Sequence, residues 1–413
     1  MNGNRLNTEI KLPCGVILKN RLVKAAMTER ISNGRLEPTK GHEILYSLWA
    51  NTGTGLLITG NVFADRNHLE SSGNVCFDKE EMLPKLKRWA NSGKEQGAHI
   101  WTQLSHAGRQ TNRFVNRHPL SASGVQLKKT GLFASPKAMT EEDIQQVIRG
   151  FVQMAKLSKE AGFTGVQIHS AHGYLLSQFL SPITNKRKDQ WGGDIENRSR
   201  LLRHIVAEIR KEVGSEFPIA VKLNSSDFQR GGFTEEESLE VIKMLEKEGI
   251  DLLEISGGTY EKVVFFLLNE EHKGLKESTI KREAYFIDFA KKVREISRIP
   301  LLITGGFRSF DFCNEVLENG ELDLIGMARP FISNFDEIPA FINGEVKSVD
   351  NIIVRSGIRK FEDAAEGGYY ARQIIRLSKG KRFNLKLNPL FSSIFLVYYE
   401  FFMAMRNKIY RLI

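Results

Sequence analysis

Two histidines and a tyrosine follow a short apolar run, and their types and spacing suit them to chemistry. His169, His172 and Tyr174 come after Val166-Gln167-Ile168, with Gly173 between the second histidine and the tyrosine. Because glycine adopts backbone conformations that other residues avoid, we expect the chain to turn here as it leaves a strand. These side chains can donate hydrogen bonds or a proton to a substrate, ligate a metal, or simply pack in a loop. A third ligand at suitable spacing is missing, so no metal site is expected.

Other polar side chains lie within or just after apolar runs. Thr28 follows Ala26 and Met27, whereas Gln103 and Lys222 lie inside runs that are otherwise apolar. A lysine in a buried strand is costly unless it meets an anion or a polar ligand. These residues are therefore candidates for contacts with a buried polar ligand.

Structural roles are the alternatives for the same residues. The Thr28 hydroxyl can cap a turn, and the Gln103 amide can satisfy barrel backbone. Lys222 can pair with an internal acid such as Glu254 on a neighbouring strand. Arg109 fits a role in cofactor or loop support as well as it fits a surface position.

Small residues follow the last three apolar runs, at Ser256-Gly257, Gly305-Gly306 and Ala328-Arg329. Adjacent glycines let backbone N–H groups approach an anion closely, and an arginine adds a bidentate donor. Barrel enzymes build phosphate sites from their last loops in this way. Together with the polar side chains above, these residues indicate a planar phosphorylated cofactor, and flavin mononucleotide (FMN) fits that description.

Eight short apolar runs alternate with helical patterns, and these elements must position the candidate residues. The runs are Arg21–Ala26, Leu56–Asn61, His99–Leu104, Gly165–His169, Ile219–Leu223, Asp251–Ile255, Pro300–Thr304 and Asp323–Gly326. Their nearly continuous hydrophobicity is typical of buried parallel strands. The helical patterns are Glu43–Ala50, Leu83–Gln96, Glu141–Ala161, Asn197–Val213, Glu235–Glu248, Glu283–Ile296 and Phe310–Glu318. This alternation predicts an α/β fold, a (β/α)8 TIM barrel, with an open doubly wound sheet as the alternative.

Local signals refine this prediction. Thr140 and Thr234 each precede a cluster of acidic residues, so we expect both to be helix N-caps. The longest connections, Ala107–Met139 and Gly173–Glu196, follow the third and fourth strands. Long ordered loops at this end of a barrel usually cover a site.

Composition excludes several classes of protein. The 413 residues include 3 cysteines without a CxxC pair, which does not support a disulfide framework or a zinc or iron–sulfur site. The first residues lack the apolar core of a secretory signal, so a cytoplasmic location is expected. The net charge of +10 is concentrated in residues 340–413, which hold 13 Lys/Arg against 6 Asp/Glu. A nucleic-acid enzyme more often carries its basic excess around its site, so nucleic acid is not an expected partner.

Several runs, in order along the chain, resemble the Old Yellow Enzyme family of FMN-dependent ene-reductases. The resemblance extends from Ile10 to about Lys381. It is carried by Leu18–Val23, Gln103–Arg109, His169–Leu176, Phe179–Pro182, Asn185–Arg187, Trp191–Gly193, Glu196–Arg198, Gly305-Gly306 and Ala328-Arg329. Long matching runs in the right order are a specific signal, and they imply a TIM barrel that binds FMN.

By position, the resemblance assigns the cofactor contacts. It implies that Ala26, Met27 and Thr28 lie beside the isoalloxazine ring, with the Thr28 hydroxyl near the N5 and O4 edge. It implies that Gln103 meets the pyrimidine edge and that Lys222 lies at N1 and O2, where it would stabilise negative charge on reduced flavin. The implied phosphate contacts are Ser256, Gly257, Gly305, Gly306, Ala328 and Arg329.

The resemblance also implies a reaction. Hydride would pass from NADH or NADPH through flavin N5 to the β-carbon of an activated C=C bond, in a ping-pong cycle on one open flavin face. His169 and His172 would donate hydrogen bonds to the substrate's carbonyl or nitro oxygen, and Tyr174 would protonate the α-carbon. The expected partner is therefore a small molecule such as an enone, enal, nitroalkene or quinone.

Two departures and two alternatives accompany this interpretation. Thr28 stands where some subfamilies have a redox-tuning cysteine, and Gly60-Asn61 replaces the small or acidic residues that many relatives carry. Another FMN barrel, such as a tRNA dihydrouridine synthase, normally needs a cysteine acid that no position here supplies. A catalytically silent flavin-binding or membrane-surface protein is the alternative of a different class, although an intact His169, His172 and Tyr174 set argues against it.

The chain changes character after the predicted barrel. We divide it into an FMN-binding barrel (1–340), a helical segment packed on the barrel (341–387) and an apolar, basic tail (388–413). The apolar run Leu390–Met405 is shorter than the roughly 20 residues of a spanning helix, and Glu400 interrupts it. Aromatic surface between basic clusters predicts weak contact with a membrane surface. A helix packed on the barrel or across a homo-oligomer is the alternative.

Overall fold

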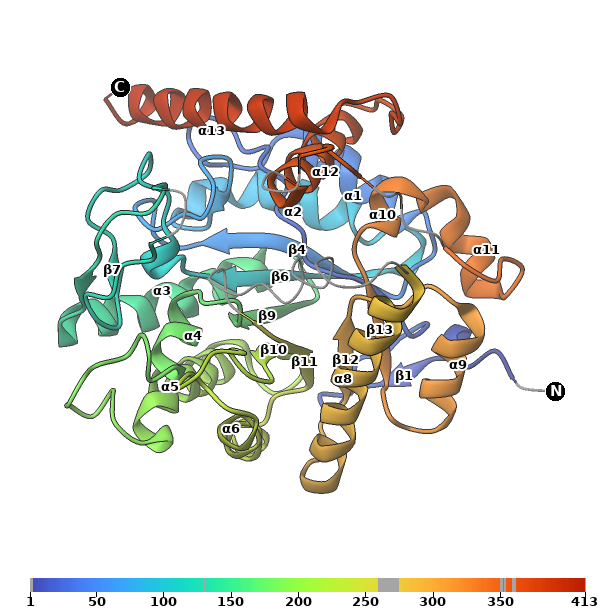
Figure 1. The fold of residues 1–413 in the computed structure, drawn as a ribbon, viewed down its shortest axis with the longest axis horizontal. Coiled ribbons are helices and arrows are strands. Elements are labelled where there is room, and N and C mark those ends of the chain that lie inside the picture. Colours follow the sequence, from blue (N-terminus) through green and yellow to red (C-terminus); the bar gives the residue numbers. More distant parts are fainter. Residues whose placement is uncertain are drawn as a thin grey trace.

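Eight parallel strands close into a barrel in the computed structural model (Figure 1). The structure describes residues 3–128, 131–258, 275–349, 352, 354–358 and 362–412. The barrel strands are β3 (Leu22–Lys24), β4 (Leu56–Phe63), β6 (His99–Ser105), β9 (Gly165–Ser170), β10 (Ile219–Asn224), β11 (Leu252–Ser256), β12 (Leu301–Thr304) and β13 (Leu324–Met327). Strand β3 pairs with both β4 and β13, so the sheet closes on itself. The predicted TIM barrel is confirmed, and each predicted run overlaps one strand.

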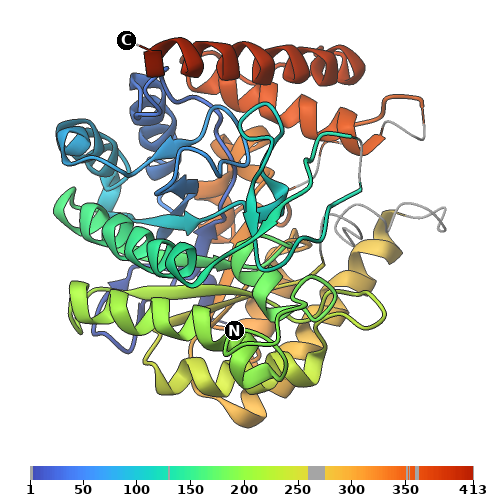
Figure 2. The same ribbon diagram turned by 90° about the vertical axis from the view of Figure 1, so that its left-hand side faces the viewer.

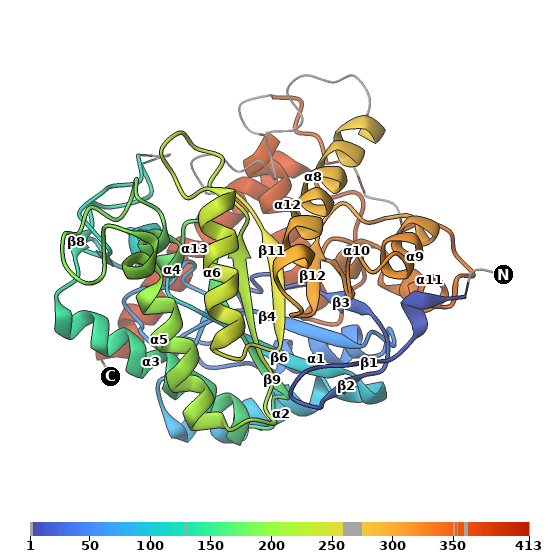
Figure 3. The same ribbon diagram turned by 90° about the horizontal axis from the view of Figure 1, so that it is seen from below.

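Helices surround the strands (Figure 3). They are α1 (Lys40–Ala50), α2 (Leu83–Ser92), α3 (Glu141–Glu160), α4 (Leu175–Leu180), α5 (Ile195–Val213), α6 (Glu235–Lys247), α8 (Leu275–Ile296), α9 (Phe310–Glu318), α10 (Pro330–Ser333) and α11 (Ile338–Asn343). The predicted N-caps are confirmed, because the Thr140 and Thr234 hydroxyls accept the backbone N–H groups of Asp143 and Glu237 at 3.2 and 3.3 Å. Helix α4 was not predicted. Its six residues are all buried and give no amphipathic pattern.

Short strands occupy the ends of the barrel and one long loop. They are β1 (Ile10–Lys11) with β2 (Ile17–Leu18), β5 (Val75–Cys76) beside β4, and β7 (Leu120–Ser121) with β8 (Lys137–Ala138). The β1–β2 hairpin packs with the apolar side chains that fill the barrel at the end where the strands begin, namely Val23, Leu56, Ile58, Trp101, Ala220, Leu252, Leu302 and Leu324. This end of the barrel interior is therefore a hydrophobic core, and polar side chains begin only two residues further along several strands.

Two helices follow the barrel. Helix α12 (Glu362–Leu377) packs against α1 and α10, and α13 (Pro389–Leu412) packs along α12 (Figure 2). A Cβ atom on Gly368 of α12 would lie 2.6 Å from the backbone of Ser393, so this glycine allows the close approach. The carboxyl end of α13 lies on the side toward which the β4 and β6 arrows point (Figure 1). In the described part of the chain, no helix has the length and apolar character needed to cross a membrane.

Strand β3 also carries a buried cation between the barrel and α1. The Lys24 ammonium donates to the Ile58 carbonyl at 2.6 Å and lies 4.3 Å from the centre of the Trp49 ring. Burial lowers the pKa of Lys24 to about 7, although the charge of Glu29 opposes this effect. The folded state therefore binds this proton less tightly than the unfolded state does.

Lys24→Met should flatten the pH dependence of stability. Between about pH 7 and about pH 10 the unfolded wild-type chain keeps the Lys24 proton that the folded chain has lost, so wild-type stability should rise with pH. Urea unfolding of the wild-type protein and the variant across this range measures the difference. Lys40→Met, on the exposed side of α1, serves as the control. Parallel pH profiles for wild type and Lys24→Met would contradict the prediction.

Candidate active site

The end of β9 brings together the two histidines and the tyrosine. The His169 ring lies 5.2 Å from the His172 ring and 4.7 Å from the Tyr174 ring, measured between centroids, and both pairs meet edge to face. The turn expected at Gly173 is confirmed by its φ of +76°, and His172 itself has a φ of +58°. A left-handed histidine is strained, and such residues occur where surrounding contacts fix a functional side chain.

His169 is buried, neutral and held in one tautomer. Burial lowers its pKa well below the usual value, and the charges of His172 and Lys222 add to this effect. Its Nδ1 accepts the backbone N–H of Ala171 at 3.2 Å. Because Nδ1 supplies a lone pair there, the proton of the neutral ring is on Nε2. His169 can therefore donate one hydrogen bond at neutral pH.

His172 is fixed by residues from three other elements. Its backbone N–H donates to Asn224 Oδ1 at 3.2 Å, and the Gln110 amide donates to its carbonyl at 2.9 Å. Burial and the charge of Lys222 lower the pKa of His172 to about 3. Its Nε2 lies 2.6 Å from the hydroxyl of Ser256, a residue that sequence reasoning had grouped with the phosphate loops. Ser256 thus supports the histidine in this structure.

A layer of polar side chains crosses the barrel interior beneath these rings. The Gln103 amide donates to Gln167 at 2.6 Å, and Gln167 donates to Glu254 at 2.7 Å. The other oxygen of Glu254 lies 2.8 Å from the Lys222 ammonium. The register places Lys222 between His169 and Glu254 on adjacent strands. The alternative role of Lys222 as a partner of Glu254 is therefore present, and the pair lies directly beside the histidine end of the barrel.

Thr28 follows β3, four residues after its last residue Lys24, and has a carboxylate beside it. Its hydroxyl donates to Glu70 at 2.6 Å, and the Asn61 amide donates to the second oxygen of Glu70. Ala26, Met27 and Thr28 are all partly exposed, unlike the buried strand that precedes them. These residues therefore line the open end of the barrel.

The predicted phosphate residues gather at the ends of β11, β12 and β13. Gly305 and Gly306 have φ values of +104° and +91°, which L-residues rarely adopt. They, with Ser256, Gly257, Ala328 and Arg329, are partly exposed at strand ends that are otherwise buried. The Arg329 guanidinium lies 2.5 Å from Glu366 of α12. Backbone N–H groups and one guanidinium can therefore meet an anion here.

These groups fit FMN. Asn61 Oδ1 and Thr304 Oγ1 are buried and have no hydrogen-bond partner among the described residues. Leaving such an atom unpaired costs about 1–3 kcal/mol, so each favours a ligand with a matching polar edge. A planar ring with polar edges would be held by Gln103, Lys222, Thr28 and Asn61, and a phosphate by the glycine loops. Bound FMN would supply the hydride-accepting and hydride-donating centre.

One cluster of possible metal ligands was not anticipated from the sequence. Asp65, His68 and His106 bring one ligand atom each within 4.8 Å of one another. However, His68 Nδ1 lies 2.5 Å from Asp65, and its Nε2 accepts the Leu120 N–H at 2.9 Å. Because Nε2 uses its lone pair, the proton is on Nδ1 and His68 has no lone pair for a metal. This cluster is explained as a hydrogen-bonded support for the loop after β4.

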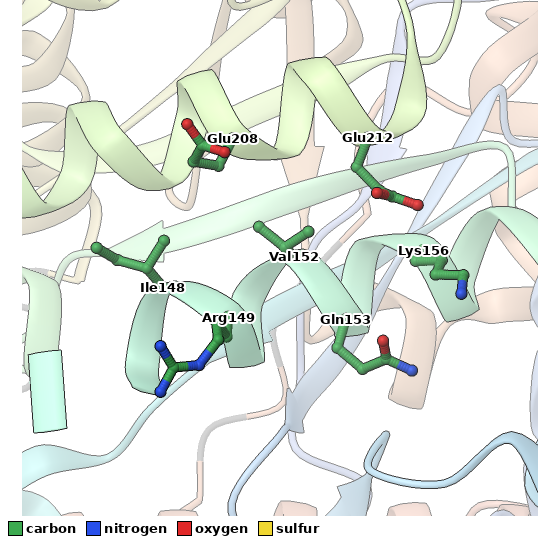
Figure 4. Close-up of a pocket in the computed structure, with 7 residues that line it drawn as sticks. All are labelled: Ile148, Arg149, Val152, Gln153, Lys156, Glu208 and Glu212. Carbon is green, nitrogen blue, oxygen red and sulfur yellow. The ribbon is translucent and has the colours of Figure 1, made fainter. Parts of the chain in front are cut away.

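A hollow of about 330 Å³ lies between the outer helices α3 and α5 (Figure 4). Its lining includes Arg149, Lys156, Glu208 and Glu212, and none of the candidate site residues. Mixed charges on the outside of two helices are typical of a solvated surface. The hollow therefore has no part in the site.

Several side chains that complete the site were not predicted from the sequence. Glu70, Gln110 and Gln167 were not identified, because a lone polar residue in a loop or strand has no local pattern. Only Gln167 had a usable sequence signal: it is a polar residue inside an apolar run, as Gln103 and Lys222 are. Arg109 is 2% exposed, so its surface interpretation is wrong and the supporting role remains.

The fold and this set of strand-end groups define a flavin-dependent TIM-barrel oxidoreductase. The model of the NADH:flavin oxidoreductase / NADH oxidase family matches residues 9–340. The chain therefore belongs to this family. As a member, it is an enzyme that uses FMN together with NADH or NADPH. The resemblance to the Old Yellow Enzyme family is confirmed.

Individual relatives agree with this assignment. An NADH-dependent flavin oxidoreductase of Talaromyces variabilis is 35% identical over 349 residues, covering 80% of this chain and 84% of its own. An NADPH dehydrogenase of a Geobacillus species is 31% identical over 327 residues, covering 78% and 88%. An Old Yellow Enzyme homologue of Zymomonas mobilis has the same fold, with a TM-score of 0.69, 23% identity and coverage of 84% and 95%. A 2-naphthoyl-CoA reductase aligns with a TM-score of 0.76 and 24% identity over 89% of this chain, which spans 58% of that protein.

Proposed function

We propose that the chain reduces an activated C=C bond in a small molecule, such as an enone, enal, nitroalkene or quinone, in a ping-pong cycle with NADH or NADPH. The observation that carries this proposal is the His169 ring, which is neutral and has its Nε2–H available at the open end of the barrel. A neutral donor polarises a carbonyl or nitro group and stabilises the negative charge that develops on its oxygen. His172 can add a second donor. When the Ser256 hydroxyl donates its hydrogen bond to Nε2 of His172, the proton of the neutral ring is on Nδ1, and this Nδ1–H group can donate.

The cofactor half of the proposed site is made by strand-end residues. Lys222 and Gln103 would hold the flavin edge, Ala26, Met27 and Thr28 would contact the ring, and the loops at Gly257, Gly305-Gly306 and Ala328-Arg329 would hold the phosphate. Lys222 is 8% exposed at its side chain and lies 2.8 Å from the Glu254 carboxylate, so its position inside the barrel is fixed by this pair. A fixed cation stabilises negative charge on a nearby ring.

Spectroscopy of the purified protein tests the proposal. We expect a yellow protein whose visible band is bleached anaerobically by NADH or NADPH and restored by cyclohexenone. A colourless protein that takes up no FMN contradicts the proposal. A yellow protein that no nicotinamide reduces would support the alternative of a silent flavin-binding protein.

Tyr174→Phe tests the proposed proton donor. Tyr174 is 4% exposed and its ring packs on His169, which suits it to protonate the carbon next to the polarised group. We expect re-oxidation by cyclohexenone to slow by about 10²-fold, the usual contribution of a general acid, while reduction by NADH changes little. Rapid mixing of each half-reaction measures both rates. Equal slowing of the two would assign Tyr174 to packing.

We also propose that α13 makes weak contact with an anionic membrane surface. Large apolar side chains of this helix are exposed, among them Phe391 at 68%, Tyr398 at 70% and Phe402 at 65%. Lys381, Arg382, Lys386 and Lys408 are exposed at its two ends. Apolar side chains flanked by basic ones suit a helix that lies in the headgroup layer of an anionic bilayer.

Flotation with liposomes tests the membrane proposal. Full-length protein should float with vesicles that contain phosphatidylserine, and less with neutral vesicles, because each basic residue near the surface contributes about 1 kcal/mol. The triple variant F391S/Y398S/F402S should stay at the bottom of the gradient. Equal flotation of variant and wild type would reject the proposal, and a stable dimer that the variant dissociates would assign the same face to self-association.

A further inference from the structure

Helix α13 docks on the barrel through polar and apolar side chains and leaves many of its large apolar side chains outward. Ser392, Glu400 and Asn407 are buried on the docked side together with Met403 and Ala404, whereas Val397, Phe401 and other large apolar side chains are exposed. A helix held only by hydrophobic burial would bury those large apolar side chains instead. Specific polar contacts therefore fix α13 in place.

Glu400 lies at the centre of these contacts. It is 9% exposed and is the one acidic residue of the helix. One carboxylate oxygen accepts the Ser72 backbone N–H at 2.8 Å, and the other accepts the Ser71 hydroxyl and lies 3.3 Å from Arg30 Nε. A buried carboxylate is costly unless its charge and hydrogen bonds are matched, as they are here.

Neighbouring residues of α13 bind the same two segments, residues 30–32 and 71–72, which we call the rim segments. The Tyr399 hydroxyl donates to the Arg30 carbonyl at 2.8 Å, Arg406 donates to the Ser32 carbonyl at 2.8 Å, and Asn407 donates to the Ser72 carbonyl at 2.6 Å. Arg30 has a φ of +61°, a strained conformation that persists where surrounding contacts enforce it. Helix α13 thus holds both rim segments at once.

The rim segments lead directly to the candidate flavin contacts. Arg30 donates to the Thr28 carbonyl at 3.1 Å, and its guanidinium lies 3.7 Å from Glu70. Glu70 immediately precedes Ser71 and accepts hydrogen bonds from the Thr28 hydroxyl and the Asn61 amide. Glu400 therefore contacts two neighbours of Glu70: Arg30, whose guanidinium lies near the Glu70 carboxylate, and Ser71, the next residue in the chain.

The direction of the hydrogen bonds on Glu70 has a chemical consequence. Because the Thr28 hydroxyl donates its hydrogen bond to Glu70, the Thr28 oxygen can offer only lone pairs to a ligand. Because the Asn61 amide N–H group also points to Glu70, Asn61 offers its unpaired Oδ1. Glu70 thus turns both side chains into acceptors, which would match the N3–H group of an oxidised flavin ring and the N5–H group that the ring carries when reduced.

We infer that Glu400 is a positioning residue: it holds Arg30 and Ser71 so that Glu70 fixes Thr28 and Asn61 as hydrogen-bond acceptors for bound flavin. This inference rests on the proposed flavin site. The family match ends at residue 340, so the positioning group comes from a segment outside the matched region. The C-terminal helix is in this way a working part of the active site.

Full-length Glu400→Gln tests the inference, with Phe402→Ser as a matched control on the outward side of the same helix. In the FMN-free protein, we expect Glu400→Gln to increase amide hydrogen exchange in residues 28–36 and 70–74, while the control leaves it unchanged. Fluorescence titration with FMN should show about tenfold weaker binding, as expected for the loss of one charged hydrogen-bonded contact. Unchanged exchange in both segments, or FMN affinity within about twofold of wild type, would overturn the inference.

A double-mutant cycle separates positioning from general loosening. Thr28→Val removes the hydroxyl, so in that background Glu400→Gln should cause a smaller further loss of FMN affinity and a smaller shift of the visible flavin band than in wild type. Additive effects would show that Glu400 acts elsewhere and would refute the inference. If wild-type protein binds no FMN, the proposed function fails instead, and hydrogen exchange alone then decides whether Glu400 holds the Thr28 segment.

Discussion

Lys222→Met is expected to bind FMN at least about 100-fold more weakly than the wild-type protein and to lose most of its reduction by NADH. The substitution removes the one cation of the polar layer and leaves Glu254, which is fully buried, without its partner 2.8 Å away. Breaking a buried pair in this way costs about 3–5 kcal/mol. Fluorescence titration with FMN and urea unfolding measure the two consequences, on flavin affinity and on stability.

The double variant K222M/E254Q separates these consequences. It is neutral at both positions, so the unpaired charge is gone and stability should return toward that of wild type. Flavin binding should stay weak, because no cation faces the ring. If the double variant instead regains both FMN affinity and reduction by NADH, the role of Lys222 is only to balance Glu254, and its assignment to the flavin is wrong.

His169→Ala is expected to slow re-oxidation by cyclohexenone by about 10²- to 10³-fold, the usual loss when one preorganised donor to a developing oxyanion is removed. The ring is fixed by the Ala171 N–H and packed between His172 and Tyr174, so it needs little reorganisation to donate from Nε2. Reduction by NADH should fall less, because that step develops no negative charge on a substrate oxygen. Rapid mixing of each half-reaction measures both rates.

The pH dependence gives an independent check on His169. Its pKa lies well below the usual value, so the ring stays neutral across the neutral range and the wild-type rate should not fall as pH rises through about 6 to 8. A charged donor would lose its proton on that rise and the rate would drop. Such a drop would contradict the neutral-donor assignment. For the His169→Ala variant, the control is His118→Ala, which removes an exposed histidine of the long loop after β6 and should leave both rates unchanged.

Several features of this protein follow from the sequence alone, because they depend on short-range pattern. Runs of buried apolar residues define the barrel strands, and threonines followed by acidic residues define the starts of α3 and α6. Glycine at position 173 marks the turn after β9. Since parallel strands of a closed barrel all end at one face, these patterns also predict that His169, Thr28, Lys222 and the Gly305-Gly306 loop share one end of the molecule. These predictions need no knowledge of strand register.

Tertiary structure alone decided how these side chains are paired. The layer formed by Gln103, Gln167, Glu254 and Lys222 depends on the register of four strands, and a shift of one residue would turn each side chain to the other face of the sheet. Glu400 meets the rim segments across more than 300 residues of chain. The apolar run around Glu400 predicted a helix. Hydrophobicity could not reveal that Glu400 and Asn407 would be buried, because their hydrogen-bond partners come from segments that are distant in the sequence. The sequence thus determined where the polar groups end up, and the fold decided which atoms they offer to a ligand.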